Sequence, residues 1–181
     1  GPDPQDPESR TVAPRWFRGP TRIGVPTTAS LAFPDAAYGP ELFDAARARL
    51  GELGYEVVEI DVTPFVEAGN LLYSGPWVAE RTAAVGDFLR DHPDEVHPVT
   101  AQIINGGVSV DAVSTFRGYD RLRELALEAN RVFEAVDAVM VPTADRFPTL
   151  AEVEAEPIAV NTALGRFTNF MNLLDYAAVA V

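Results

Sequence analysis

The sequence contains no cysteine and no lysine. Without cysteine, the chain has no disulfide, no thiolate nucleophile and no zinc-thiolate site. All fourteen basic residues are arginine, so these residues cannot supply a lysine base, a Schiff-base lysine or the lysine of a phosphate-binding P-loop. The two absences exclude a redox protein, a zinc finger and any lysine-dependent mechanism carried by this chain alone.

Positive charge is also scarce, because the 181 residues carry a formal net charge of −13. Binding to nucleic acid depends on Lys and Arg side chains that displace counterions from the phosphates. An anionic membrane surface attracts basic segments for the same reason. We therefore expect neither nucleic acid nor a membrane as a partner.

Long hydrophobic runs are missing too. The apolar stretches are far shorter than the roughly 20 residues that span a bilayer, and the Pro- and Asp-rich start has no signal-peptide core. We therefore expect a cytoplasmic protein. The length and the 47% hydrophobic content fit one globular domain or a large part of one.

The first half of the chain predicts a lead-in followed by a strand–helix–strand unit. Residues 1–20 are dense in proline, glycine and charge, so we expect them to be irregular. A strand is predicted for residues 21–26, an amphipathic helix for 38–53 with Tyr38, Leu42, Ala46 and Leu50 on one face, and a second strand for 55–62. This order favours a parallel βαβ unit.

The remaining residues are predicted to be mainly helical. Two or three short helices are expected in residues 63–105, a long helix in 109–136, a strand in 137–142, a short acidic helix in 149–156, a turn-rich helical segment in 161–175 and a last strand in 177–181. The long helix is indicated by apolar residues at steps of three and four. The whole pattern indicates an α/β fold.

Tyr73 and Arg81 are the candidate binding residues. Tyr73 precedes a Gly-Pro break, and Arg81 follows in a helix that Pro76 can open at its first position. A guanidinium can hold a carboxylate through two hydrogen bonds, and a phenol can add a third. The alternative is that Arg81 pairs with Glu80 or Asp87 on a solvated face while the tyrosine belongs to the core.

Other polar clusters favour structural roles. His92 and His97 stand among acidic residues, but their spacing is not that of a helical zinc motif, so a solvated loop is preferred to a metal site. Asn161, Asn169 and Asn172 are expected to tie loops to backbone groups. No serine lies in a Gly-x-Ser-x-Gly elbow. We assign no catalytic residue and no metal ligand, and we expect no cofactor.

Three stretches together resemble the amidase-signature family and, within it, the allophanate hydrolases. They are YSGPWVAER (73–81), VPTADRFPTLAEVEAEP (141–157) and NTALGRFTNFMNLLDYAAVAV (161–181). The opening DPQDPESR (3–10) resembles the segment that follows the catalytic core in those enzymes. The Tyr-x-Gly-Pro-Trp-x-x-Glu-Arg block is among the more specific parts, and Ser74 stands where a glycine is common.

The resemblance implies an α/β/α sandwich with a mixed β-sheet flanked by helices, of which residues 21–181 form an incomplete C-terminal portion. It also implies hydrolysis of allophanate, the carboxylated form of urea, in urea degradation. In such enzymes one serine attacks the amide, a second serine in a cis peptide relays its proton to a lysine, and backbone amides hold the oxyanion. Those groups lie upstream of the present residues, so we expect the 181 residues to be inactive alone.

The resemblance also assigns roles and partners. Tyr73 and Arg81 match the positions that hold the carboxylate of the substrate. The expected partners are allophanate and the missing N-terminal half of the amidase domain. A homodimer is a further alternative, because an incomplete sheet exposes strand edges and apolar surface. The alternatives are another amidase-signature hydrolase, an amidotransferase amidase subunit, or a non-catalytic α/β binding module.

Overall fold

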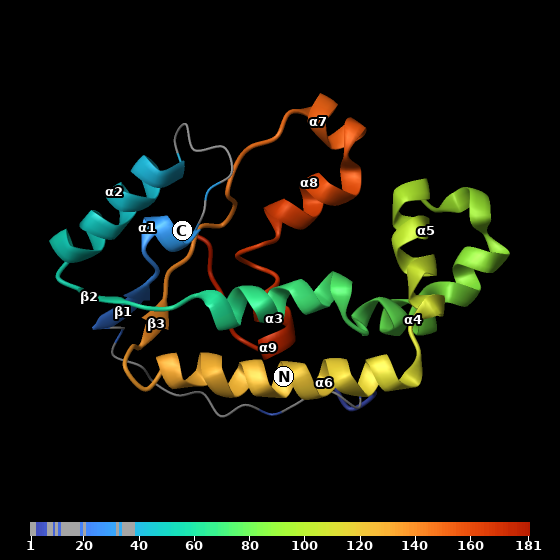
Figure 1. The fold of residues 1–181 in the computed structure, drawn as a ribbon, viewed down its shortest axis with the longest axis horizontal. Coiled ribbons are helices and arrows are strands. Elements are labelled where there is room, and N and C mark those ends of the chain that lie inside the picture. The colour runs from blue at the N-terminus through green and yellow to red at the C-terminus, as the bar shows by residue number, and fades with distance from the viewer. Residues whose placement is uncertain are drawn as a thin grey trace.

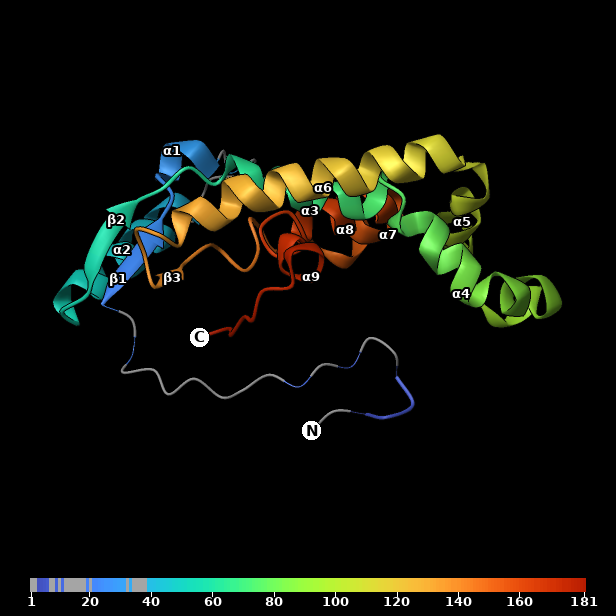
Figure 2. The same ribbon diagram turned by 90° about the horizontal axis from the view of Figure 1, so that it is seen from below.

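The computed structural model of the chain describes residues 3–6, 9, 11, 19, 21–31, 33 and 39–181. The molecule is elongated, with a small sheet at one end, a helical hairpin at the other, and helix α6 (Ala112–Val132) running along most of its length (Figures 1 and 2). Tyr38 and most of the predicted lead-in lie outside the described residues. In the described part, no helix is long and apolar enough to cross a membrane.

The sheet contains three strands in the order β2-β1-β3. They are β1 (Arg22–Val25), β2 (Glu56–Glu59) and β3 (Ala138–Val139). Gly24 is in register with Val58 on one side and with Val139 on the other, and both pairings are parallel. The three predicted strands before residue 150 and the parallel βαβ unit are therefore confirmed, with shorter strands than expected.

Helices make up most of the remaining structure. The first eight helical segments are α1 (Thr28–Leu31), α2 (Gly39–Glu52), α3 (Thr63–Ser74), α4 (Trp77–Asp91), η1 (Pro93–Glu95), α5 (Pro98–Asn105), η2 (Gly106–Ser109) and α6. The predicted short helices and the long helix are confirmed. Helix α6 begins after Asp111, whose carboxylate accepts the backbone N–H of Ser114 at 2.8 Å, as an N-cap residue does.

The C-terminal part is helical as predicted, except for its end. It contains α7 (Leu150–Ala155), α8 (Pro157–Leu164) and α9 (Phe170–Leu174). The strand predicted for residues 177–181 is wrong, since these residues pair with no described strand. Apolar, β-branched composition favours a strand, but a strand also needs a neighbour to hydrogen-bond with.

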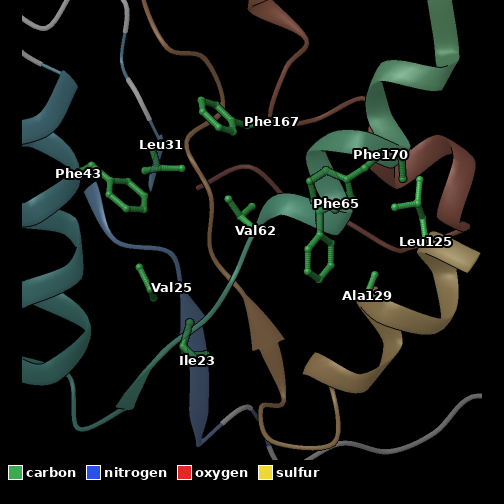
Figure 3. Packing of buried hydrophobic residues seen from close by; sticks show 11 residues of the cluster. Ile23, Val25, Leu31, Phe43, Val62, Phe65, Leu125, Ala129, Phe167 and Phe170 are labelled. Atoms are coloured by element: carbon green, nitrogen blue, oxygen red, sulfur yellow. The ribbon is translucent and has the colours of Figure 1, made fainter. Parts of the chain in front are cut away.

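The hydrophobic core lies between the sheet and helices α2, α3, α6 and α9 (Figure 3). Phe65 of α3 is fully buried, and its ring centroid lies 5.2 Å from that of Phe170 in α9. Leu125 and Ala129 of α6 pack into the same cluster. A Cβ at Gly69 would lie only 3.0 Å from the backbone nitrogen of Phe170, so α3 and α9 approach closely. Helix α3 is therefore held between α6 and α9.

Candidate functional site

The candidate site lies at the junction between α3 and α4. Helix α3 ends at Ser74, and Gly75 and Pro76 separate it from α4. Proline lacks a backbone N–H and its ring crowds the preceding turn, so α3 cannot continue through it. The break predicted from the sequence is confirmed, although Pro76 is the N-cap of α4 rather than its first residue.

Tyr73 and Arg81 come together across this junction. The Cζ atom of Arg81 lies 5.1 Å from the ring centroid of Tyr73, which is the distance of a cation–π contact. Tyr73 is 41% exposed and Arg81 is half-buried. The two residues selected from the sequence thus form one polar surface site, which we call the Tyr73–Arg81 pair.

The ion pair expected under the alternative reading is not formed. Asp87 lies 2.7 Å from Arg90 instead. Among the described residues, no carboxylate lies within ion-pair distance of the Arg81 guanidinium, and none accepts a hydrogen bond from it or from the Tyr73 hydroxyl. The donors of the pair are therefore available to a ligand.

The first turns of α4 are packed against two other segments. The hydroxyl of Thr82, the residue after Arg81, lies within hydrogen-bond distance of two carbonyl oxygens. They are those of Val78, at 3.0 Å, and of Ile104 in α5. Gly107 of η2 is buried against the same turn, where a Cβ would overlap the Val78 carbonyl. These contacts fix the start of α4 and the helix face that carries the guanidinium.

The other sequence candidates have structural roles. His97 caps α5, with its Nδ1 atom accepting the backbone N–H of Val99 at 3.3 Å. His92 stacks on Phe88 with a centroid distance of 4.6 Å. Asn161 donates to the Pro157 carbonyl at 2.7 Å. Across the described residues, no group of three His, Cys, Asp or Glu side chains could hold a metal ion.

A large cavity was not predicted from the sequence. It has a volume of about 1420 Å³ and lies between α2, β3, residues 140–148 and the C-terminal residues 176–181. Asp145 lines it with a buried carboxylate whose Oδ1 atom has no hydrogen-bond partner in the described structure. Neither Tyr73 nor Arg81 lines this cavity or the smaller one beside α7 and α8. Several far-separated segments form it, so local sequence patterns give no signal of it.

Several known proteins are similar to this chain in both sequence and fold. No protein-family model matches the chain. The urea amidolyases of Saccharomyces cerevisiae and Lachancea kluyveri are 39% and 37% identical to it over 144 residues, which cover 78% of the chain. A solved Kluyveromyces lactis allophanate hydrolase is 31% identical over 97% of the chain, with a TM-score of 0.87. The chain is a homologue of allophanate hydrolase.

The match to allophanate hydrolase confirms the resemblance drawn from the sequence and the α/β class. The Kluyveromyces lactis urea amidolyase agrees, with 34% identity over 86% of the chain and a TM-score of 0.80. The chain spans 8% of the length of the two curated urea amidolyases and 29% of the solved allophanate hydrolase. It therefore corresponds to one part of these allophanate-hydrolase homologues.

Proposed function

We propose that this chain is the substrate-anchoring part of an allophanate hydrolase, and that Tyr73 and Arg81 hold the carboxylate of allophanate. One observation carries the proposal. The Arg81 guanidinium stacks on Tyr73 across the α3–α4 junction and has no carboxylate partner among the described residues. An arginine whose position is fixed and whose charge is not neutralised is suited to an anionic ligand.

The chemistry of the pair fits a carboxylate better than a neutral amide. The planar guanidinium can donate two parallel hydrogen bonds to the two carboxylate oxygens, and the Tyr73 hydroxyl can donate a third. The ring of Tyr73 supports the cation through a contact worth about 0.5–1 kcal/mol at an exposed site. Arg81 therefore loses little side-chain entropy when the anion binds.

The groups that break the amide bond belong to other polypeptide in this proposal. The chain has no lysine, so a Ser-Ser-Lys triad cannot be built from it. The outer edge of β3 has no partner among the described strands, and the apolar cavity of about 1420 Å³ lies beside it. These two surfaces are where the remainder of the amidase domain would pack and bring its catalytic groups to the bound substrate.

The test replaces Arg81 in the full-length protein that carries these residues. A hydrogen bond to a charged group contributes about 1.5–3 kcal/mol of binding free energy. Arg81→Ala should therefore lower kcat/KM for allophanate by about 10- to 150-fold. An uncharged amide substrate lacks the carboxylate, so its kcat/KM should change by less than about threefold. Comparable losses on both substrates would refute the anchoring role and favour another amidase-signature activity.

Arg90→Ala is the matched control. Arg90 lies on the same helix but is exposed and pairs with Asp87 and Asp91. Exposed ion pairs contribute little, so this variant should keep the kinetic constants of the wild type on both substrates. A loss that is shared by Arg90→Ala and Arg81→Ala would indicate a general effect of removing positive charge from α4.

A further inference from the structure

Gly118 occupies an unusual position in α6. It lies inside the helix, where glycine is less favourable than alanine. Its φ angle is not in the left-handed region, so its backbone conformation does not require glycine. A Cβ at this position would overlap the Cδ atom of Pro76 and lie 2.8 Å from Cγ. The space that a side chain at residue 118 would fill is therefore occupied by the ring of Pro76, the N-cap residue of α4.

The next residue of α6 contacts the same junction. The Tyr119 ring meets that of Trp77 edge to face, with centroids 5.4 Å apart and an interplanar angle of 67°. Two consecutive residues of α6 thus contact two consecutive residues at the start of α4. The long helix lies along α3 and reaches the α3–α4 junction (Figures 1 and 2).

The geometry of the Tyr73–Arg81 pair depends on this junction, because its two members belong to different helices. Helix α3 is fixed by its core contacts through Phe65 and Gly69. The position of Arg81 depends on the direction of α4, which is set by the contacts with α5 and η2 together with the contact of Pro76 with α6. A methyl group at residue 118 would push Pro76 away from α6, tilt α4 and change the 5.1 Å contact.

We propose that Gly118 is a positioning residue for carboxylate binding, acting through Pro76 to set the distance between Tyr73 and Arg81. This inference rests on the proposed function, since it concerns the same pair. Gly118 does not touch the substrate in this account. Its role is to let α6 and the start of α4 approach closely enough for the hydroxyl and the guanidinium to reach one carboxylate.

The experiment measures kcat and KM of the full-length protein on allophanate and on an uncharged amide, for wild type, Gly118→Ala and Arg81→Ala. Hydrogen bonds to charged groups are stronger than those between neutral groups, so moving the Arg81 guanidinium away from the carboxylate should raise KM of Gly118→Ala for allophanate about tenfold. Its kcat should stay within about twofold, and so should the KM for the uncharged amide. Gly51→Ala is the control, since a Cβ there meets no described atom within 4 Å, and it should leave both KM values unchanged.

A double variant shows whether the effect passes through Pro76. In a Pro76→Ala background the obstructing ring is absent, so Gly118→Ala should raise KM less than it does in the wild type. Equal increases in the two backgrounds would overturn the proposed route. If Gly118→Ala yields little folded protein, Tyr119→Leu, which removes the contact with Trp77 without adding volume at residue 118, should raise KM for allophanate selectively, and an unchanged KM would count against the proposal.

The outcomes separate the two proposals. If Arg81→Ala raises KM for allophanate while Gly118→Ala does not, the positioning role is wrong and the anchoring role stands. If Arg81→Ala affects both substrates equally, the anchoring role itself fails and the positioning role fails with it. A selective rise of KM in both variants supports both.

Discussion

At the scale of single residues, the proposed site consists of two side chains, Tyr73 and Arg81, that have no hydrogen-bond acceptor among the described residues. The Arg81 guanidinium lies over the aromatic ring of Tyr73, with 5.1 Å between Cζ and the ring centroid. Elsewhere in the described structure, many arginines, such as Arg90 and Arg121, pair with acidic residues. Arg81 differs from these two arginines in having no carboxylate partner among the described residues.

Tyr73→Phe isolates the hydroxyl from the ring. The variant keeps the cation–π contact but loses one donor, and a single hydrogen bond to a charged group is worth about 1.5–3 kcal/mol. We expect KM for allophanate in the full-length protein to rise by about tenfold or more, with the thermal unfolding midpoint unchanged. Steady-state kinetics combined with a thermal melt gives both values, and an unchanged KM would show that the hydroxyl takes no part in binding.

Asp137 provides a test of pH dependence. Its carboxylate accepts the backbone N–H groups of Thr21 and Arg22, both at 2.9 Å, and these bonds lower its pKa below the ordinary value. A lowered pKa in the folded state stabilises the protein above the unfolded pKa of about 3.9, and the stabilisation is lost as pH falls through the folded value. In the full-length protein, wild type should therefore melt higher than Asp137→Asn at pH 7.

Thermal melts of the same two proteins below about pH 4 complete this test. As the wild-type carboxyl group becomes protonated, the difference in unfolding midpoint between wild type and Asp137→Asn should shrink. A difference that stays constant from pH 7 to pH 3 would mean that the charge on Asp137 does not contribute to joining the start of β1 to the chain before β3.

At the scale of secondary-structure elements, glycines mark where helices approach closely. Gly107 is buried against the Val78 carbonyl, whereas Gly51 near the end of α2 has open space around it in the described structure. Gly51→Ala should stabilise the protein by about 0.5 kcal/mol, because alanine has the higher helix propensity. Gly107→Ala should destabilise it by about 1–3 kcal/mol, because the added methyl has no room. Chemical denaturation of both variants checks the opposite signs.

Most elements could be predicted because local sequence determines them. The short segment stopped by Pro26 indicates β1, the β-branched residues of 55–62 indicate β2, and the three- and four-residue apolar spacing indicates α6. The last strand could not be predicted correctly, since pairing depends on a distant neighbour. Tyr73 and Arg81 were predicted as candidates from a motif, but their 5.1 Å contact joins two helices whose relative direction depends on tertiary packing. Non-local contacts of this kind leave no periodic signal in one sequence.

At the scale of the whole molecule, the described part of the chain exposes apolar surface and an unpaired strand edge. The apolar cavity of about 1420 Å³, the outer edge of β3 and the exposed Val179 lie at the same end of the molecule. Large apolar patches and unpaired strand edges favour association. This arrangement agrees with the 29% of the solved allophanate hydrolase that the chain covers.

The isolated 181-residue chain should therefore associate. Light scattering during a thermal melt should show oligomers or aggregates, together with a broad transition. A sharp, cooperative transition of a monodisperse monomer would instead support a self-sufficient α/β binding module. Purified 181-residue protein should also release no ammonia from allophanate, since it lacks the lysine of the proposed triad.

The most direct measurement is a crystal structure of the full-length protein with its nucleophilic serine replaced by alanine and allophanate bound. We expect the substrate carboxylate to lie about 2.7–3.1 Å from the Arg81 guanidinium nitrogens and the Tyr73 hydroxyl. A carboxylate held by other residues, with Arg81 and Tyr73 away from the substrate, would contradict the anchoring role.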